Sequence, residues 1–312
     1  MSTYYRLINF QYSFLLLIIA IFYEITNVNS MSCNWVKGNM PAIGSYSSLA
    51  YGNGTFVAIT DIALGFYNGS GAYSRDGINW HPTIISPKFE WGYIGWTGIA
   101  YGAGKFVAVG SGGIAYSANG IDWRQNVMLN LTLESVVYAN GKFVAVSYDI
   151  SASSIDGIKW QTYNLNPSQY IVGYGAGKFV AFGGYSNITA YSMDGINWNE
   201  TAMPSMQSWC SVAYGNGKFI MISCTMSCNA YSTDGITWNA VNYSEGNMRS
   251  ITYGGGLFVT VSDIGARYSA DGINWSSAAH MPSSLGSLWN DVIYADGKFV
   301  AISDDRSAVC QP

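Results

Sequence analysis

A unit of about 40 residues recurs along the chain, and this repetition restricts the possible folds more than any other feature of the sequence. The clearest copy runs from Trp96 to Trp123 and contains three β-rich runs before a short last one. A glycine turn at 102–104 joins the first two runs, and Asn119-Gly120 follows the third. Such turns are typical of tight hairpins, because glycine accepts a positive φ without strain. Each copy is therefore predicted to form a four-stranded antiparallel sheet, with Trp123 ending the fourth strand.

The two halves of the unit do not occur equally often. The first half carries a tyrosine before its turn and occurs seven times, at Tyr51, Tyr101, Tyr138, Tyr174, Tyr214, Tyr253 and Tyr294. The second half ends in a tryptophan and occurs six times, at Trp80, Trp123, Trp160, Trp198, Trp238 and Trp275. A match for the missing half lies near the other end of the chain, where Cys33-Asn34-Trp35 resembles the Ile-Asn-Trp ending of other copies.

Repeats of this length and strand number are typical of β-propeller blades, and radial closure removes the open edges of the sheets. The sequence thus predicts an all-β fold, namely a seven-bladed β-propeller of four-stranded antiparallel blades. In this interpretation the N-terminal strand completes the last blade and closes the ring.

The N-terminal segment is predicted to direct secretion. Arg6 precedes an apolar run from Phe14 to Phe22, and a polar stretch follows it and ends at Ser30. The run is shorter than the roughly 20 residues that a membrane span needs, which favours a cleaved signal. We expect residues 1–30 to be a secretory signal peptide and residues 31–312 to form a single seven-bladed propeller domain. An uncleaved membrane anchor is the alternative.

Charge and composition exclude several classes of partner and cofactor. The net charge is −4, which gives no electrostatic support to a nucleic-acid partner. His81 and His280 are the only histidines, and the sequence contains no metal-ligand spacing and no glycine-rich phosphate loop. We therefore expect neither a metal nor a cofactor, and no membrane span once the signal is cleaved.

Five cysteines in a secreted chain indicate disulfide bonds. Cys33 and Cys310 occupy positions that flank the same turn in other copies, so we predict a bridge between them that joins the two ends of the ring. Cys224 and Cys228 lie at the two ends of one predicted loop, which favours a local bridge. Cys210 is then left over and is interpreted as a small buried apolar residue.

Sequons for N-glycosylation are slightly more frequent than chance, and the predicted signal peptide places them on a secretory route. They occur at Asn53, Asn68, Asn130, Asn187, Asn199, Asn242 and Asn274.

The second half of the unit, as in the run from Ser74 to Trp80, resembles the Asp-box (BNR-like) repeat of sialidases and related secreted propellers. The first half resembles that of uncharacterised repeat propellers from bacteria, phages and large viruses. The usual Asp box carries one more residue between its aspartate and its glycine than this chain does. The resemblance implies a fold rather than an activity. We expect the aspartates to accept backbone N–H groups within the turn and the tryptophans to pack between blades.

Ligand binding is predicted on one face of the propeller. The short Tyr-Gly and Asp-Gly turns share one face, named the turn face, and the more variable connections share the other, named the loop face. On the loop face, aromatic and polar residues at the start of the innermost strands suit sugar binding. The candidate ligand-binding residues are Trp96, Glu134, Tyr170, Trp209, Arg249, Trp289 and Asn290. The alternative is that the aromatic residues fill the core.

Sialidase chemistry requires a group of arginines that holds a carboxylate. The candidates are Arg249, Arg267 and Arg306, and Arg267 begins a predicted third strand, about 10 Å outward from the innermost strand. The Arg-Ile-Pro motif common in that family is absent as well. We therefore expect the protein not to be an enzyme.

The leading hypothesis from the sequence is a secreted, non-enzymatic recognition or adhesion protein. Its partner would be a glycan or a cell-surface or extracellular protein, bound through the loop face. A divergent Asp-box glycosidase and a structural subunit of an extracellular coat or fibre are the alternatives.

Overall fold

A computed structural model describes residues 33–63, 70–85, 95–111, 113–126, 132–225, 228–242, 247–276, 279–282 and 288–312. The predicted signal peptide and the sequons at Asn68 and Asn130 lie outside the described residues. Within these ranges every regular element is a β-strand. None of the described segments forms an apolar helix long enough to cross a bilayer.

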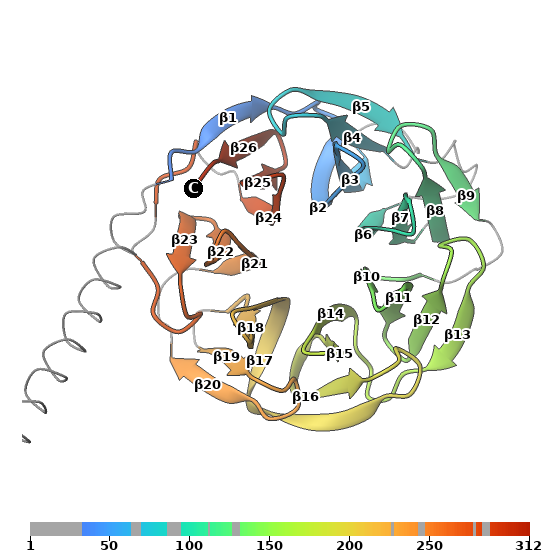
Figure 1. Ribbon diagram of the computed structural model, residues 1–312, viewed down its shortest axis with the longest axis vertical. Coiled ribbons are helices and arrows are strands. Elements are labelled where there is room, and N and C mark those ends of the chain that lie inside the picture. The colour runs from blue at the N-terminus through green and yellow to red at the C-terminus, as the bar shows by residue number, and fades with distance from the viewer. Residues whose placement is uncertain are drawn as a thin grey trace, which may run out of the picture.

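The strands form antiparallel sheets that lie side by side around a common centre (Figure 1). Strands β2 to β5, β6 to β9 and β10 to β13 form three of these sheets, each with four strands. Strand β1 joins β24, β25 and β26 in a fourth sheet of the same size. Strands β14 to β20 form one seven-stranded sheet, and β21 to β23 form a three-stranded sheet. The architecture is therefore all β and radial, as the repeats predict.

The first strand of each of the seven repeats lies nearest the centre (Figure 1). These innermost strands are β2 (Gly44–Gly52), β6 (Trp96–Gly102), β10 (Ser135–Ala139), β14 (Ile171–Gly175), β17 (Asn199–Gly215), β21 (Met248–Gly254) and β24 (Trp289–Ala295). The strands paired with them are β3 (Thr55–Ala63), β7 (Lys105–Gly110), β11 (Lys142–Ser147), β15 (Lys178–Phe182), β18 (Lys218–Ser223), β22 (Leu257–Ser262) and β25 (Lys298–Ser303).

The third strands in order are β4 (Ser70–Ser74), β8 (Gly113–Ser117), β12 (Ile150–Ser154), β16 (Tyr185–Ser192), β19 (Cys228–Ser232), β23 (Gly265–Ser269) and β26 (Arg306–Cys310). The outer strands are β1 (Val36–Asn39), β5 (Trp80–Ile84), β9 (Arg124–Asn126), β13 (Gln161–Asn164) and β20 (Asn239–Asn242). The first part of β17 pairs with β16 as an outer strand, and its last part pairs with β18 as an innermost strand. One long strand thus links two repeats into the seven-stranded sheet.

The position of the outer strand differs from the prediction. Residues 121–123 do not form a strand, and β9 begins one residue after Trp123. The reason is that the preceding turn controls the backbone up to the tryptophan, whose Nε1 donates a hydrogen bond back to the carbonyl oxygen of Gly120 (3.1 Å). The tryptophan therefore closes the turn, and the outer strand follows it.

This turn, named the Ser-Asp turn, recurs with the same hydrogen bonds. In the first copy, Ser74 Oγ accepts the N–H of Gly77 (2.9 Å), and Asp76 Oδ1 accepts the N–H groups of Ile78 and Asn79 (2.8 Å each). The other copies are centred on Asn119, Asp156, Asp194, Asp234 and Asp271. The aspartates thus serve the backbone of their own turns, as the sequence predicts.

The hydrogen bonds of the Ser-Asp turn also affect titration. Burial raises the pKa of Asp76, but the hydrogen bonds from Asn79, Ile78 and Ser74 outweigh it and hold that pKa below the usual value for aspartate. Asp194 shows the same balance. A lowered pKa in the folded state means that these turns stabilise the fold when ionised and lose that contribution as the pH falls into the acidic range.

The tryptophans that close the turns pack between neighbouring sheets. Trp80 lies in one buried cluster with Phe56 of its own sheet and with Val300, Ile302 and Val309 of the sheet formed by β1 and β24 to β26. Its Nε1 donates to Gly77 O (2.8 Å) and lies 2.9 Å from Ser307 Oγ of the same neighbouring sheet. These contacts agree with the expectation that the tryptophans join adjacent blades.

Close contacts between a glycine and a tyrosine join neighbouring sheets on the turn face. A Cβ atom added to Gly52 would lie 2.0 Å from the ring of Tyr101, and one added to Gly102 would lie 1.9 Å from the ring of Tyr138. Where glycine follows the repeated tyrosine, at five of the seven positions, it leaves room for the tyrosine of the next repeat. The hairpin motif thus serves the packing of neighbouring sheets against each other.

The first described strand pairs with the last. Strand β1 runs antiparallel to β26, with Val36 opposite Val309 and Asn39 opposite Arg306. Cys33 and Cys310 form the disulfide expected from the sequence, with their Cα atoms 5.7 Å apart.

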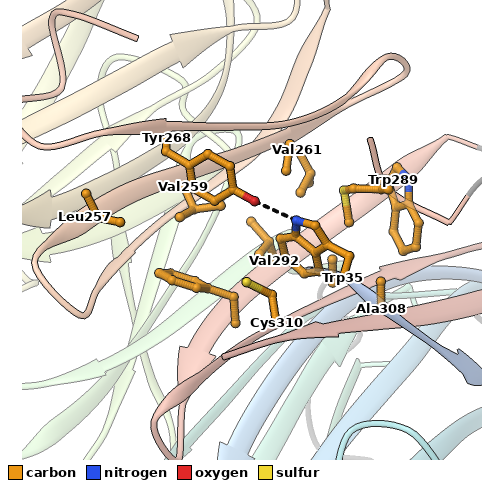
Figure 2. Close-up of a cluster of buried hydrophobic side chains, with 13 residues drawn as sticks. Trp35, Leu257, Val259, Val261, Tyr268, Trp289, Val292, Ala308 and Cys310 are labelled. Carbon is orange, nitrogen blue, oxygen red and sulfur yellow. Dashed lines mark hydrogen bonds between the residues drawn. The ribbon is translucent and has the colours of Figure 1, made fainter. Parts of the chain in front are cut away.

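Trp35 follows Cys33 and lies in a buried cluster that spans two sheets (Figure 2). Its Nε1 donates a hydrogen bond to the hydroxyl of Tyr268 on β23 (2.7 Å). The start of the described chain is therefore held by backbone pairing to β26, by a covalent bond and by packing against β23.

Candidate functional site

One position at the loop-face end of each innermost strand, or up to two residues before the strand, is buried. This position holds Tyr46, Trp96, Leu133, Gln169, Trp209, Met248 and Trp289, and none of these side chains is more than 2% exposed. The prediction that Trp96, Trp209 and Trp289 contact a ligand is therefore wrong. The alternative that the aromatic residues fill the core is confirmed.

The reason for this burial is packing between sheets. Trp96 lies against Ile59 and Ile85 of the preceding sheet, and Trp289 lies against Val261 and Met281. Each tryptophan fills the space between two innermost strands at the loop-face end of the core.

The next residue along each strand connects neighbouring sheets through polar contacts. In five of the strands a β-bulge occurs at this position, which redirects the side chain. Ser47 Oγ donates to the carbonyl oxygen of Trp96 (2.6 Å), and Thr97 Oγ1 donates to that of Leu133 (3.1 Å). Asn290 Nδ2 donates to the carbonyl oxygen of Tyr46 (3.0 Å) and so joins β24 to β2. Asn290, a predicted ligand contact, thus has a structural role in this contact.

One residue further along, a second set of hydrogen bonds runs in the same direction. Ser135 accepts the N–H of Val172 (3.3 Å), and Ser211 accepts that of Ile251 (3.3 Å). The matching acceptor between β24 and β2 is a carboxylate. Asp291 Oδ2 accepts the N–H of Leu49 (2.8 Å). An aspartate thus makes, between the last and first innermost strands, the contact that serines make elsewhere.

The environment of Asp291 changes its titration. Burial raises the pKa of Asp291 to about 6, although Ser250 Oγ (2.6 Å) and the N–H groups of Val292 and Leu49 (2.8 Å each) donate to it. An acid whose pKa is raised in the folded state binds its proton more tightly there than in the unfolded chain. Its contribution to stability therefore increases as the pH falls from about 6 towards 4.

We expect the Asp291 carboxyl to titrate with a midpoint near pH 6 in ¹³C NMR of protein labelled at aspartate. The Ser-Asp turn aspartates should titrate far below this midpoint because their pKa values are lowered. Loss of one resonance in Asp291→Asn assigns the signal. A midpoint below pH 4 for that resonance would contradict the buried environment of this carboxyl.

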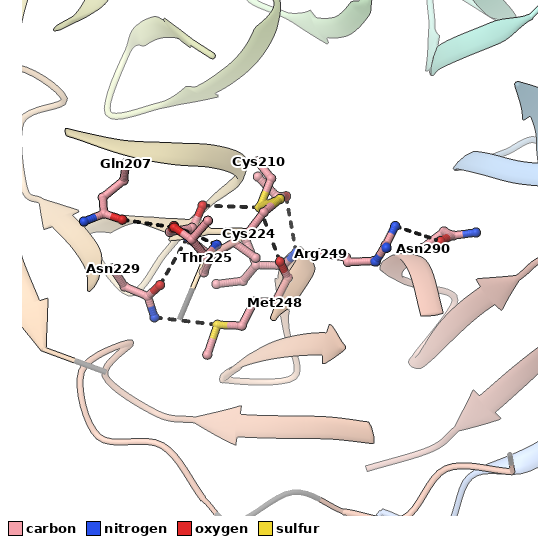
Figure 3. Close-up of a disulfide and its surroundings, with 12 residues drawn as sticks. Gln207, Cys210, Cys224, Thr225, Asn229, Met248, Arg249 and Asn290 are labelled. Atoms are coloured by element: carbon pink, nitrogen blue, oxygen red, sulfur yellow. Dashed lines mark hydrogen bonds between the residues drawn. A yellow bond between two sulfur atoms is a disulfide. The ribbon is translucent and has the colours of Figure 1, made fainter. Parts of the chain in front are cut away.

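Arg249 lies exposed on the loop face, beside the polar contacts that join β24 to β2 (Figure 3). Its guanidinium is 3.5 Å from Asn290 Oδ1, and Asn290 Nδ2 donates to Asp304 Oδ1 (2.8 Å). Ser45 Oγ donates to the same carboxylate oxygen (2.6 Å). The structure therefore brings Arg249 and Asn290 together, with Arg249 exposed and Asn290 partly buried.

Glu134 and Tyr170 form a second group on the loop face, together with residues that the sequence did not single out. The rings of Tyr148 and Tyr170 have centroids 5.9 Å apart. Tyr148 is 60% exposed, and Tyr185, which follows Gly183 and Gly184 beneath the Tyr170 ring, is 70% exposed. We name Glu134, Tyr148, Tyr170 and Tyr185 the tyrosine cluster.

The backbone of Tyr148 shows that its exposed position is costly. Ser147 and Ile150 pair across a two-residue turn between β11 and β12, and Tyr148 occupies its first position with φ of +45°. Bulky residues rarely adopt a positive φ, and such strain costs on the order of 1 to 3 kcal/mol. Hydrogen bonds from the N–H groups of Leu165 and Gln169 to the carbonyl oxygens of Asp149 and Tyr148 hold the turn in place.

The second cysteine pair differs from the expected one. Cys210 and Cys224 form a disulfide, and Cys228 is a free, buried thiol (Figure 3). The bulge at Cys210 lies opposite the end of β18, where Trp209 pairs with Ser223, and the next residue, Cys224, has its Cα atom 5.7 Å from that of Cys210. The prediction of a Cys224–Cys228 bridge is therefore wrong, and Cys228 takes the buried apolar role assigned to Cys210.

The described residues do not assemble a catalytic or metal centre of the kinds considered. They contain no group of three His, Cys, Asp or Glu side chains that could hold a metal ion. Arg267 is buried and donates to the carbonyl oxygen of Ser276 (3.1 Å), and Arg306 is buried and paired with Asp305. Two of the three candidate arginines thus form polar contacts within their own sheets, whereas Arg249 faces solvent.

Four of the sequon asparagines have described side chains, and all four are exposed: Asn53, Asn187, Asn199 and Asn274. The side-chain nitrogen of Asn274 donates to Asp271 Oδ2 (2.7 Å), so a glycan on this nitrogen would compete with a Ser-Asp turn. Asn187 lies two residues from Tyr185, and a glycan there would border the tyrosine cluster.

Comparison with known proteins identifies the fold but not a family. No protein-family model matches the sequence, and no curated protein matches it. Among solved structures, YCF48 bound to D1 peptide has a TM-score of 0.70 at 11% identity over 90% of this chain and 95% of that chain. Virginiamycin B lyase from Staphylococcus aureus has a TM-score of 0.75 at 8% identity over 90% and 99%.

The WD40 β-propeller domain of Doa1 has a TM-score of 0.64 at 13% identity, covering 89% of this chain and 95% of that chain. These neighbours differ in function, and at such identities they report on architecture alone. The chain has the fold of a β-propeller.

Proposed function

We propose that the protein is a non-enzymatic interaction scaffold that binds a segment of an extracellular protein on the loop face of a closed, seven-bladed propeller. The observation that carries the proposal is the tyrosine cluster. Tyr148 and Tyr185 leave most of their side-chain surface exposed, and Tyr148 does so on a strained turn. Tyrosine is enriched at the centres of protein interfaces because it offers a large apolar surface with a polar end.

Contacts between innermost strands support the count of seven blades and the closure of the ring. Along the chain, β2 contacts β6, β6 contacts β10, and the series continues through β14, β17, β21 and β24. Strand β24 then contacts β2. The seven-stranded sheet is interpreted as two blades that share β17, and the three-stranded sheet as a blade whose outer position is occupied by the pairing of Ala266 with Ala279.

Within the described ranges, the motifs of the turn face are used in packing and in backbone hydrogen bonds. The Ser-Asp turns bind their own backbone, and the Tyr-Gly hairpins pack against neighbouring sheets. These contacts also support the resemblance to Asp-box repeats at the level of the turn. The remaining exposed apolar side chains on that face include Ile155 and Met193, which stand alone at the second positions of two Ser-Asp turns.

The cysteine pairs support an extracellular location. Disulfides form and persist in oxidising compartments, and two pairs of cysteines lie at disulfide distance. We retain a cleaved signal at residues 1–30, a single propeller domain over residues 31–312 and glycosylation at exposed sequons as parts of the proposal.

A protein partner is favoured over a glycan. The glycan hypothesis depended on tryptophans that stack on sugar rings, and Trp96, Trp209 and Trp289 are buried. The glycosidase alternative depended on a group of arginines that holds a carboxylate of the substrate. Arg267 instead donates to the carbonyl oxygen of Ser276, and Arg306 pairs with Asp305. One structural neighbour, YCF48, is described with a bound peptide, which illustrates that a propeller of this size can hold one.

The proposal predicts that peptide binding depends on the loop face. Peptides selected from a phage-displayed random library on the oxidised protein should bind a Tyr148→Ala, Tyr185→Ala variant about 10-fold or more weakly, as expected for interface hot spots. The matched control is Ile155→Ala, Met193→Ala, which removes two exposed apolar side chains from the turn face. Affinities are measured by isothermal titration calorimetry.

All proteins in this comparison carry Asn187→Gln, so that a glycan beside the cluster does not obscure the result. Equal affinities for both double variants would refute the proposal, as would a selection that yields no peptide sensitive to the loop-face change.

A further inference from the structure

A second carboxylate on the loop face, Asp61, interacts electrostatically with Glu134 of the tyrosine cluster. Asp61 is on β3 at the loop face, and its Oδ1 would be 2.5 Å from a Cβ atom added to Gly95, so the carboxylate rests on the backbone just before β6. Glu134 precedes β10, where its N–H donates to the carbonyl oxygen of Val146 (2.9 Å). Asp61 belongs to the sheet of β2 to β5 and Glu134 precedes the sheet of β10 to β13, and β6 contacts the innermost strands of both.

Glu134 is partly buried, and within the described part of the chain none of the groups that shift its pKa is a cation. Burial raises the pKa of Glu134, and the negative charge of Asp61 raises it further. The Tyr170 hydroxyl is affected by the same group, since burial and the proximity of Tyr148 and Glu134 raise its pKa. The backbone places Glu134 beside these tyrosines, because its N–H donates to Val146 O (2.9 Å), two residues before Tyr148, and Ser135 Oγ accepts the N–H of Val172 (3.3 Å), two residues after Tyr170.

The tyrosines add a second property of the site. The Tyr170 ring is held in place, because Cβ atoms added to Gly183 and Gly184 would each lie 2.9 Å from it. Tyr148 stands beside it at a ring separation of 5.9 Å and is largely exposed. Aromatic faces attract cations, and the attraction is strongest where water is partly excluded.

Together these observations distinguish among ligand classes. An anionic group would be repelled by Glu134 and Asp61. An apolar group would remove water from Glu134 without replacing its interactions, which is unfavourable for a carboxylate. A cationic side chain would pair with the carboxylates and lie against the tyrosine rings.

We propose that the site formed by Asp61, Glu134, Tyr148 and Tyr170 binds a lysine or arginine side chain of the partner protein. This inference rests on the proposed function and names the chemical class that the loop face recognises. Arginine fits both features, because its planar guanidinium stacks on aromatic rings and pairs with carboxylates.

The test uses the peptides selected from the phage-displayed library on the full-length, oxidised protein. They should share a basic residue, and replacement of a selected arginine by citrulline should weaken binding about 10-fold to 100-fold, as for a desolvated charge pair. Glu134→Gln should cause a similar loss. Glu200→Gln, an exposed carboxylate on the outer part of β17, is the matched control and should have no effect.

Two further measurements separate the outcomes. Affinity should fall as the pH is lowered through the raised pKa of Glu134, because the protonated acid no longer pairs with a cation. Asp61→Asn serves as the second variant, and circular dichroism verifies that each variant is folded.

Peptides that require Tyr148 and Tyr185 but lack a basic residue and tolerate Glu134→Gln would overturn this inference and leave the proposed function standing. Peptides that are indifferent to Tyr148 and Tyr185 would overturn both.

Discussion

Replacing Cys33 and Cys310 together by serine is expected to lower the free energy of unfolding by about 5 kcal/mol. The two residues are 277 positions apart, so their bond closes nearly the whole described chain into one loop. In the chain-entropy account, a cross-link restricts the unfolded chain more as the loop becomes longer. The loss should also favour separation of β1 from β26, because Cys33 precedes the strand and Cys310 ends its partner.

The measurement is urea denaturation without reductant, followed by tryptophan fluorescence. The matched control replaces Cys210 and Cys224, which are 14 positions apart and whose removal should cost about 3 kcal/mol by the same account. A control that loses as much stability as the Cys33 and Cys310 variant, or more, would show that the long loop is not the source of the effect.

Truncating Trp80 to alanine is expected to cost about 3 to 5 kcal/mol, the range for large aromatic side chains in cores. Trp80 is 7% exposed and lies between two sheets. The variant loses packing against Val300, Ile302 and Val309, and it leaves Gly77 O and Ser307 Oγ without the indole N–H.

Thermal and urea unfolding measure the loss, and Trp80→Phe separates its parts. Phenylalanine keeps much of the packing and removes the hydrogen bonds, so its cost should be clearly smaller than that of alanine. A loss below about 1 kcal/mol for Trp80→Ala, typical of surface substitutions, would contradict the role of this residue in joining neighbouring sheets.

The architecture could be predicted from the sequence because its determinants are local and repeated. The Ser-Asp turns depend on residues within a few positions of each other, as in Ser74 and Asp76, and therefore leave a regular pattern. The Cys33–Cys310 pair was also accessible, because both residues could be aligned with the same turn in other copies. The limits of the outer strands could not be predicted in this way, because the turn extends up to Trp123 rather than ending before it.

The candidate site was less predictable because burial depends on neighbours that the sequence does not align. Trp96 at the start of a strand has the same local signature whether it faces a ligand or the next sheet. The β-bulges that redirect Thr97 and Asn290 leave no mark in the repeat. Cys210 pairs with Cys224 through the register of β17 with β18, which sequence spacing does not reveal.

One signal for the tyrosine cluster was present in the sequence. The connection between the second and third strands reads Ser111-Gly112 in one copy and Gly183-Gly184 in another, whereas the third copy has Tyr148-Asp149. A bulky aromatic residue at a position where these two copies have the small residues Ser111 and Gly183 indicates a role beyond the turn. Comparison of the copies at this connection would have identified Tyr148.

Photo-crosslinking tests most directly the claim that the loop face binds a protein partner. A photoreactive phenylalanine analogue is placed at Tyr185 on the loop face or at Met193 on the turn face, both exposed side chains. Each protein is irradiated with the extracellular proteins of its source. The account predicts a discrete crosslinked product from position 185 that Tyr148→Ala abolishes, and none from position 193. Crosslinks from position 193 instead, or a product from position 185 that survives Tyr148→Ala, would contradict it.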